Sequence, residues 1–245
     1  MQTLRVCARQ GRSPAPQKMR TLKLAIYHLS VKTISRSAGR SATPAAAYRS
    51  GSHIRDERTG EVHDYRRRKG VMARGLIQPH DSPFRSRGGL WNAAEMAERR
   101  INSTVAREYE LALPAELDRD RQVALATAFA RYLVQTYRVG ADIAVHAPSG
   151  DGDRRNVHAH ILTTTRVVEA DGIGAKTRIL DAAKTGSVEI SRIREHWATM
   201  VNTALREAGI AKSIDHRSFE ARGLEASATV HLGPALTAVE RRRRR

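Results

Sequence analysis

The sequence predicts an α+β fold in which an antiparallel sheet carries helices packed on one of its faces. Two observations support this class. Short apolar or alternating runs, typical of strands, lie between turn-forming segments, and two long stretches have the spacing of amphipathic helices. The chain of 245 residues is long enough to bury one core. We expect a disordered leader at 1–20, one folded domain at 21–235 and a basic tail at 236–245. Met19, just before the first strand-like run, is an alternative translation start.

The first half of the domain alternates strands with basic loops. Leu22–Leu29 is predicted to be a strand, and Ser30–Thr43 a loop whose Ser, Arg and Gly content suits phosphate. Thr43 is a plausible N-cap for a short helix that begins at Pro44 and ends near Ser50. Further predicted elements are a hairpin at His53–Tyr65, a strand at Met72–Ile77, and a helix whose buried side includes Leu90, Trp91, Ala94, Ala97 and Ile101.

The second half contains the longest predicted helices. Arg107–Leu113 alternates, so Tyr109 shares one strand face with two leucines while Glu108 and Glu110 share the other. Asp118 caps a helix that runs to about Tyr137. A polar loop is predicted at Ala170–Gly186, followed by a helix from about Val188 to Ala208 that buries Trp197.

Composition limits the partners of this domain. The formal net charge is +18 and the sequence pI is about 11.1, with arginine far more common than lysine. Arginine matches phosphate through its planar fork, so a polyanion is the expected partner, although a GC-rich genome would give a similar composition. The single Cys7 excludes a disulfide framework and fits a reducing cytoplasm. Because no apolar run is long enough for a membrane span, we expect no membrane insertion.

The densest group of candidate ligands is a stretch of three histidines. His146, His158 and His160 are three of ten histidines in the chain and fall within fifteen residues. His158 and His160 project from the same side of a strand, and a hairpin folded about Gly152 places His146 opposite His158, with Cβ atoms roughly 5 Å apart. Three imidazoles that converge would form a divalent-metal site with coordination positions left for substrate. The alternative is that these are hydrogen-bonded histidines without a metal.

The acidic pair has two interpretations as well. Two carboxylates side by side on a strand face are unfavourable unless a cation or a donor faces them. Glu108 and Glu110 therefore either lie on a wetted edge strand or line the same site as the histidines.

Four segments in this order resemble a known family. They are AIYHLSVKTISRSAGRSATPAAAYRSG from Ala25 to Gly51, REYELALP from Arg107 to Pro114, HAPSGDGDRRNVHAHIL from His146 to Leu162, and IDHRSFEARGLE from Ile214 to Glu225. Together they resemble the nicking domain of the MobA/MobL plasmid-mobilisation relaxases, which belong to the HUH class of metal-dependent, tyrosine-using DNA nickases. The resemblance runs from about Leu22 to about Pro234 and implies a five-stranded antiparallel sheet.

The resemblance also implies roles for particular residues. Tyr48 matches the nucleophile, and His146, His158 and His160 match the ligands of a divalent metal, with Mg²⁺ or Mn²⁺ expected first and Zn²⁺ as the alternative. Glu108 and Glu110 match an acidic pair expected to orient a ligand histidine or to assist proton movement. The implied product is a 5′-phosphotyrosyl DNA. A tyrosine, with a pKa of about 10, is a better leaving group than an aliphatic alcohol, so its phosphodiester keeps the strand activated for rejoining.

The implied partner is the single-stranded origin DNA of a plasmid, nicked for conjugative transfer together with accessory mobilisation proteins and a conjugative coupling protein. Basic residues expected to contact this DNA are Arg36, Arg40, Arg49, Arg66, Arg67, Arg68, Lys69 and Arg217. Two alternatives stay open. One is another HUH nickase, either a rolling-circle replication initiator or a transposase, and the other is a non-enzymatic DNA-binding remnant of a relaxase.

Overall fold

A computed structural model describes residues 27–148 and 153–217 of the chain. The expected leader, the basic tail, most of the strand predicted at 22–29, the turn predicted at Gly152 and residues 218–225 of the last resembling segment lie outside these ranges. The larger sheet is built from the strands β1 (Leu29–Ser35), β4 (Val71–Ile77), β5 (Thr104–Ala112), β6 (Ala141–His146) and β7 (His158–Thr164). The smaller hairpins are β2 (His53–Arg55) with β3 (Val62–Asp64), and β8 (Arg166–Glu169) with β9 (Gly172–Lys176).

The five-stranded sheet has the order β1-β5-β7-β6-β4, and every neighbouring pair is antiparallel. The expected five-stranded antiparallel α+β architecture is therefore confirmed. The register between β6 and β7 places His146 opposite His158, as predicted for a hairpin centred on Gly152. Glu110 lies opposite His160 in the pairing of β5 with β7, so the acidic pair and the histidines share one face of the sheet.

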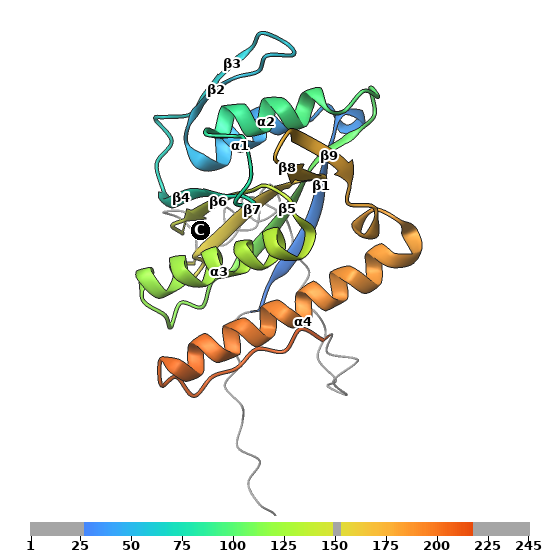
Figure 1. The fold of residues 1–245 in the computed structure, drawn as a ribbon. Helices are drawn as coiled ribbons and strands as arrows, with labels where there is room; N and C mark the ends of the chain where they lie inside the picture. Colours follow the sequence, from blue (N-terminus) through green and yellow to red (C-terminus); the bar gives the residue numbers. More distant parts are fainter. Residues whose placement is uncertain (1–26, 149–152, 218–245) are drawn as a thin grey trace, which may run out of the picture.

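Helices lie on both faces of the sheet rather than on one (Figure 1). The long helices α3 (Arg119–Tyr137) and α4 (Ala183–Glu207) bury the face that carries Tyr109, through a core that includes Phe129 and Trp197. The shorter helices α1 (Ala42–Ser50) and α2 (Arg87–Met96) cover part of the other face. Alanines and Trp91 from these helices pack on Ile34, Ala106 and Leu162 of the sheet. The histidine face is thus half covered and half open.

Several element boundaries differ from the sequence prediction. The segment predicted as a loop from Ser30 contains β1, because an edge strand with one wetted side can be as polar as a loop. Ile101 is 89% exposed, since α2 ends at Met96 before its apolar spacing does. The predicted loop at Ala170–Gly186 contains β9, a short 3-10 turn at Arg178–Leu180 and the first turn of α4.

Other elements match the prediction. The helix capped by Asp118 and ending at Tyr137 is confirmed, and the Asp118 side chain accepts a hydrogen bond from the backbone of Arg121. The hairpin at β2–β3 and the strand β4 are also confirmed. Trp91 and Trp197 are fully buried, as expected of core residues. None of the described helices, including the 25-residue α4, has the apolar length that a bilayer crossing requires.

Candidate functional site

The three histidines meet at the open end of the sheet, where β6 ends and β7 begins. One nitrogen from each of His146, His158 and His160 lies within 4.8 Å of the others. Their ring centroids are 4.9 to 5.3 Å apart. Of the three side chains, His146 is buried and the other two are half-buried. The predicted convergence of the three rings is confirmed.

Burial decides the charge state of two of these rings. Loss of hydration lowers the pKa of His146 to about 4, and it lowers the pKa of His158 as well. Both imidazoles are therefore neutral near pH 7, which is the form that coordinates a metal. Each also has a backbone acceptor, because the carbonyl of Arg49 lies 2.7 Å from Nε2 of His146 and that of Asn156 lies 3.0 Å from Nδ1 of His158.

The third ring is oriented by a carboxylate. Nδ1 of His160 lies 2.7 Å from Oε1 of Glu108, and this hydrogen bond leaves Nε2 of the ring as the free ligand atom. The side chain of Glu108 is only 5% exposed. Burial by itself raises the pKa of this carboxyl group, but hydrogen bonds from His160 and Arg49 outweigh burial and lower the pKa to about 2. Glu108 is therefore a buried carboxylate held in its charged form.

Arg49 completes this network from helix α1. Its Nε and one terminal nitrogen lie 2.5 and 2.6 Å from the two oxygens of Glu108, a two-point contact that a lysine could not reproduce. Glu110, the other acid of the pair, instead accepts a hydrogen bond of 2.6 Å from Lys32 of the edge strand. Burial opposes ionisation of Glu110, but this hydrogen bond lowers its pKa. The two predicted acids thus have different surroundings, because Glu108 is hydrogen-bonded to a histidine ring and Glu110 to a lysine.

Tyr48 lies on the last turn of α1, next to Arg49. Its side chain is 48% exposed, whereas Tyr109 and Tyr137 are buried in the core as expected. The guanidinium of Arg68 lies 3.8 Å from the centre of the Tyr48 ring, and the ring of Tyr65 meets it edge-on at 5.2 Å. These contacts hold the ring in place. Tyr48 also lines a cavity of about 450 Å³, together with Arg40, Arg49 and Glu61, among others.

The end of α1 is attached to the sheet through its own carbonyl groups. The last carbonyls of a helix have no partner inside it and must find one elsewhere. Arg68 donates to the carbonyl of Tyr48, His146 contacts that of Arg49, and Arg74 donates to those of Ser50 and Gly51. The turn that carries Tyr48 is therefore fixed against β4 and β6. Arg74 was not among the residues predicted from the sequence, where its one signal is a charged residue inside a predicted strand.

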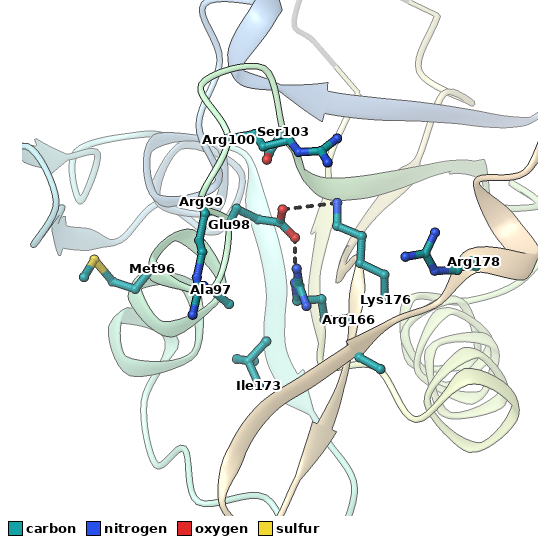
Figure 2. A pocket seen from close by; sticks show the side chains of 11 residues that line it. Met96, Ala97, Glu98, Arg99, Arg100, Ser103, Arg166, Ile173, Lys176 and Arg178 are labelled. Atoms are coloured by element: carbon teal, nitrogen blue, oxygen red, sulfur yellow. Dashed lines mark hydrogen bonds and ion pairs between the residues drawn. The ribbon is translucent and has the colours of Figure 1, made fainter.

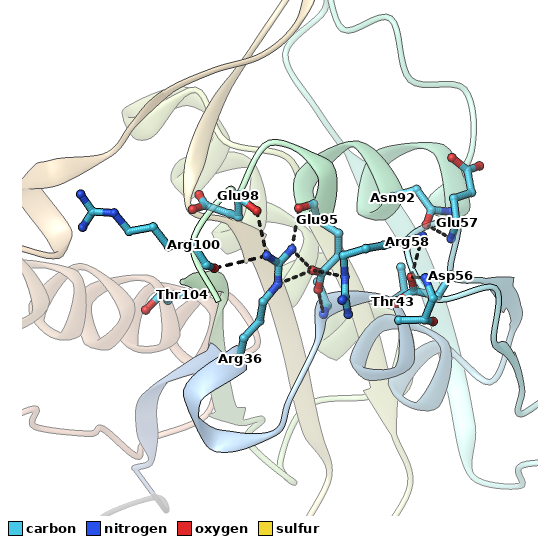
Figure 3. A network of polar contacts seen from close by, with 12 residues as sticks. Arg36, Thr43, Asp56, Glu57, Arg58, Asn92, Glu95, Glu98, Arg100 and Thr104 are labelled. Atoms are coloured by element: carbon cyan, nitrogen blue, oxygen red, sulfur yellow. Dashed lines mark hydrogen bonds and ion pairs between the residues drawn. The ribbon is translucent and has the colours of Figure 1, made fainter. Parts of the chain in front are cut away.

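The basic residues predicted to contact DNA fall into two groups. Arg36 and Arg49 are already used within the fold. All five N–H groups of Arg36 donate to Glu95 or to the carbonyls of Glu98 and Arg100, so no donor is left for a phosphate. Figure 3 shows its guanidinium enclosed by these acceptors. The geometry does not support Arg36 as a DNA contact. Its guanidinium group instead connects the end of β1 to the end of α2.

The second group is accessible. Arg40 borders the cavity beside Tyr48, and Arg68 stacks on the tyrosine ring. Arg67 and Lys69 are exposed in the loop before β4. Arg66 and Arg217 are also exposed but form ion pairs with the neighbouring Asp64 and Asp215. Contact between these residues and DNA stays a prediction.

Comparison with known proteins agrees with this geometry. The family model described as the MobA/MobL family matches residues 40–242, and the chain belongs to this family. It is 44% identical over 245 residues to the mobilization protein MobL of Acidithiobacillus ferridurans, covering 89% of this chain and 65% of that protein. It is 36% identical over 237 residues to the mobilization protein A of Escherichia coli, covering 89% of this chain and 31% of that protein. The chain therefore spans less than two thirds of the length of these relatives.

A solved structure shares the fold. It comes from work on the molecular basis of vancomycin resistance transfer in Staphylococcus aureus, and it superimposes with a TM-score of 0.69 at 27% identity. The match covers 79% of this chain and all of that chain.

Proposed function

We propose that this chain is the nicking domain of a plasmid-mobilisation relaxase, which cleaves one strand of a transfer origin by transesterification to Tyr48. One observation carries the proposal beyond family membership. Arg49, the neighbour of Tyr48, connects the last turn of α1 to the histidine cluster through two contacts. Its carbonyl contacts His146, and its side chain pairs with Glu108. Nucleophile and candidate metal ligands therefore form one connected unit.

The donor set suits a divalent metal. Three neutral imidazoles would hold the ion at His146, His158 and His160 while keeping its full positive charge. An all-nitrogen set favours Mn²⁺ or Zn²⁺ over Mg²⁺, which prefers oxygen ligands. When bound, the ion would supply charge that neutralises the scissile phosphate.

The protein's own residues perform the remaining work. Glu108 fixes the ring of His160, and Arg49 fixes Glu108. The phenolic oxygen of Tyr48 attacks phosphorus, the bond from phosphorus to the 3′ oxygen breaks, and that oxygen gains a proton as the phenol loses one. The products are a free 3′-hydroxyl and a 5′-phosphotyrosine. Rejoining is the same exchange in reverse, so the number of phosphoester bonds is unchanged.

The test is a covalent adduct assay on origin DNA of the plasmid that carries this gene. Wild-type protein incubated with Mn²⁺ and labelled single strands should give a protein–DNA adduct that survives denaturing electrophoresis. Tyr48→Phe should give no adduct but keep its DNA affinity, because only the hydroxyl is removed. Tyr65→Phe is the matched control, since its ring packs on Tyr48, and it should still form the adduct. An adduct with Tyr48→Phe would reject this nucleophile, and a wild-type protein that binds DNA without any adduct would favour a non-enzymatic remnant.

A further inference from the structure

A second basic pocket lies away from the histidines, where the end of α2 meets the β8–β9 hairpin (Figure 2). Its volume is about 880 Å³. The charged lining residues are five cations and one carboxylate, namely Arg99, Arg100, Arg166, Lys176, Arg178 and Glu98. The rest of the described lining is small or aliphatic, with no aromatic ring on which a base could stack.

The pocket retains positive charge after its internal pairs are counted. The buried Glu98 carboxylate is shared between Arg166 at 2.7 Å and Lys176 at 3.2 Å. The side chains of the other three cations, Arg99, Arg100 and Arg178, make no hydrogen bond or ion pair with any residue in the described part of the chain. Figure 2 shows these guanidinium groups spread around Glu98 and its partners. Unpaired guanidinium groups around a cavity favour a ligand with several anionic oxygens, and phosphate is such a ligand.

The walls of this pocket are held in place by hydrogen bonds to backbone carbonyls. Arg36 fixes the segment after α2 through the carbonyls of Glu98 and Arg100, and its backbone N–H donates to the carbonyl of Ser103. On the other side, Arg166 donates to the carbonyl of Gly174 and so ties β8 to β9. The free arginines therefore extend from segments whose backbone is already ordered, which reduces the entropy lost on binding.

The pocket lies at the opposite end of β5 from the histidines. Lys176 reaches the carbonyl of Thr104, the first residue of β5, while Glu110 faces His160 six positions later. At ~3.4 Å per residue these points are about 20 Å apart along the strand. An anion in the pocket would therefore be separate from the phosphate at Tyr48, but one DNA strand could reach both.

We propose that this pocket binds backbone phosphates of the origin DNA at a second position, remote from the nick. The inference rests on the proposed function, because it assigns a further part of the same substrate to this surface. The contact is independent of base sequence, since the described lining offers charge and no stacking ring. It anchors the strand while Tyr48 acts on another phosphate.

The salt dependence of DNA binding tests this assignment. Binding is measured without metal, so that no strand is cut, on mixed-sequence single strands of ~30 and ~3 nucleotides. The variant Arg99→Ala/Arg100→Ala/Arg178→Ala should make the slope of log K against log salt, where K is the association constant, less negative by about 2 on the longer strand, because three phosphate contacts are lost. On the shorter strand, which cannot span both places, its binding to the Tyr48 site should match that of wild type.

Two companion variants separate charge from folding. Arg121→Ala/Arg131→Ala/Arg206→Ala removes three exposed arginines from α3 and α4 and should keep the wild-type slope. Arg99→Lys/Arg100→Lys/Arg178→Lys should restore most of the slope, because phosphate attraction depends mainly on charge. If the alanine variant of the pocket and the α3–α4 control change the slope by the same amount, the pocket does not bind DNA. An acidic protein partner then becomes the better occupant. Failure of the nicking proposal is a separate result, namely wild-type protein that forms no adduct.

Discussion

Glu108 accepts hydrogen bonds from two elements at once, from His160 of β7 at 2.7 Å and from Arg49 of α1 at 2.5 and 2.6 Å. A single buried carboxylate therefore sets the relative position of the helix that carries Tyr48 and the strand that carries two of the histidines. Removing its charge should affect metal affinity and stability together, whereas removing that of Glu110 should not.

Glu108→Gln should lower metal affinity by about 10- to 100-fold, because the ring of His160 loses a charged acceptor. Titration calorimetry with Mn²⁺ measures the change directly. The matched control is Glu110→Gln, on the same strand face but paired with Lys32, which should bind the ion nearly as well as wild type. Equal losses in the two variants would show that general negative charge, and not the orientation of His160, supports the site.

Arg49→Ala should destabilise the fold by about 1–3 kcal/mol, since it leaves a buried carboxylate with one fewer partner. The partial exposure of Arg49 keeps the loss below that of a fully buried ion pair. Urea unfolding monitored by circular dichroism gives the value. Arg49→Lys should recover only part of it, because an ammonium group supplies the charge without the two-point contact. Arg67→Ala, an exposed change in the basic loop, should stay within about 0.5 kcal/mol of wild type.

Glu95→Gln should cost about 3 kcal/mol, because the buried Glu95 carboxylate both pairs with Arg36 and accepts a 2.5 Å hydrogen bond from the backbone of Ala42 at the start of α1 (Figure 3). A double-mutant cycle with Arg36→Gln measures the coupling, and the two losses should not add. Glu57→Gln, an exposed acid in the same region, is the control. Additive losses would mean that the two side chains stabilise the fold independently.

Glu98 should make stability depend on pH. Burial raises the pKa of Glu98, but hydrogen bonds from Arg166 and Lys176 outweigh it, so the pKa in the folded state lies below the ordinary value of 4.5. A carboxyl group with a lowered folded pKa contributes stability above its unfolded pKa and loses that stability as the pH falls through the folded pKa. The unfolding free energies of wild type and Glu98→Gln should therefore differ most near pH 7 and converge as the pH falls below 4.5 and through the lowered folded pKa. A constant difference across this range would contradict the assignment.

The sequence predicted the parts of the fold that depend on strong local patterns. The turn-forming residues around Gly152 and the spacing of the histidines were enough to predict that His146 lies opposite His158, because a hairpin centre determines every pair around it. The helix after Asp118 was predicted from its N-cap and the spacing of its apolar residues, which are also local patterns. The edge strand β1 was missed because its wetted side gives it the composition of a loop, and the end of α2 because Ile101 continues the apolar spacing into solvent.

The candidate site was predicted residue by residue but not in its connections. Family resemblance and spacing brought forward Tyr48, the three histidines and the acidic pair. Nothing in the sequence distinguishes an unpaired arginine from one that is paired within the fold, so Arg36 and Arg49 were predicted to contact DNA together with the exposed basic residues. Their roles depend on Glu95 and Glu108, each 59 positions further along the chain, and such long-range ion pairs leave no local pattern.

The alanines of α1 limit how this family can vary. Ala42, Ala46 and Ala47 are almost completely buried in the core that α1 shares with α2 and the sheet, so each position holds only a methyl group. A larger aliphatic side chain there would lift the whole helix and move Tyr48 away from the histidines without altering any polar residue. We therefore expect related chains to restrict these positions to Gly, Ala or Ser. Selection there would act on volume alone, at three side chains that have no direct part in the chemistry.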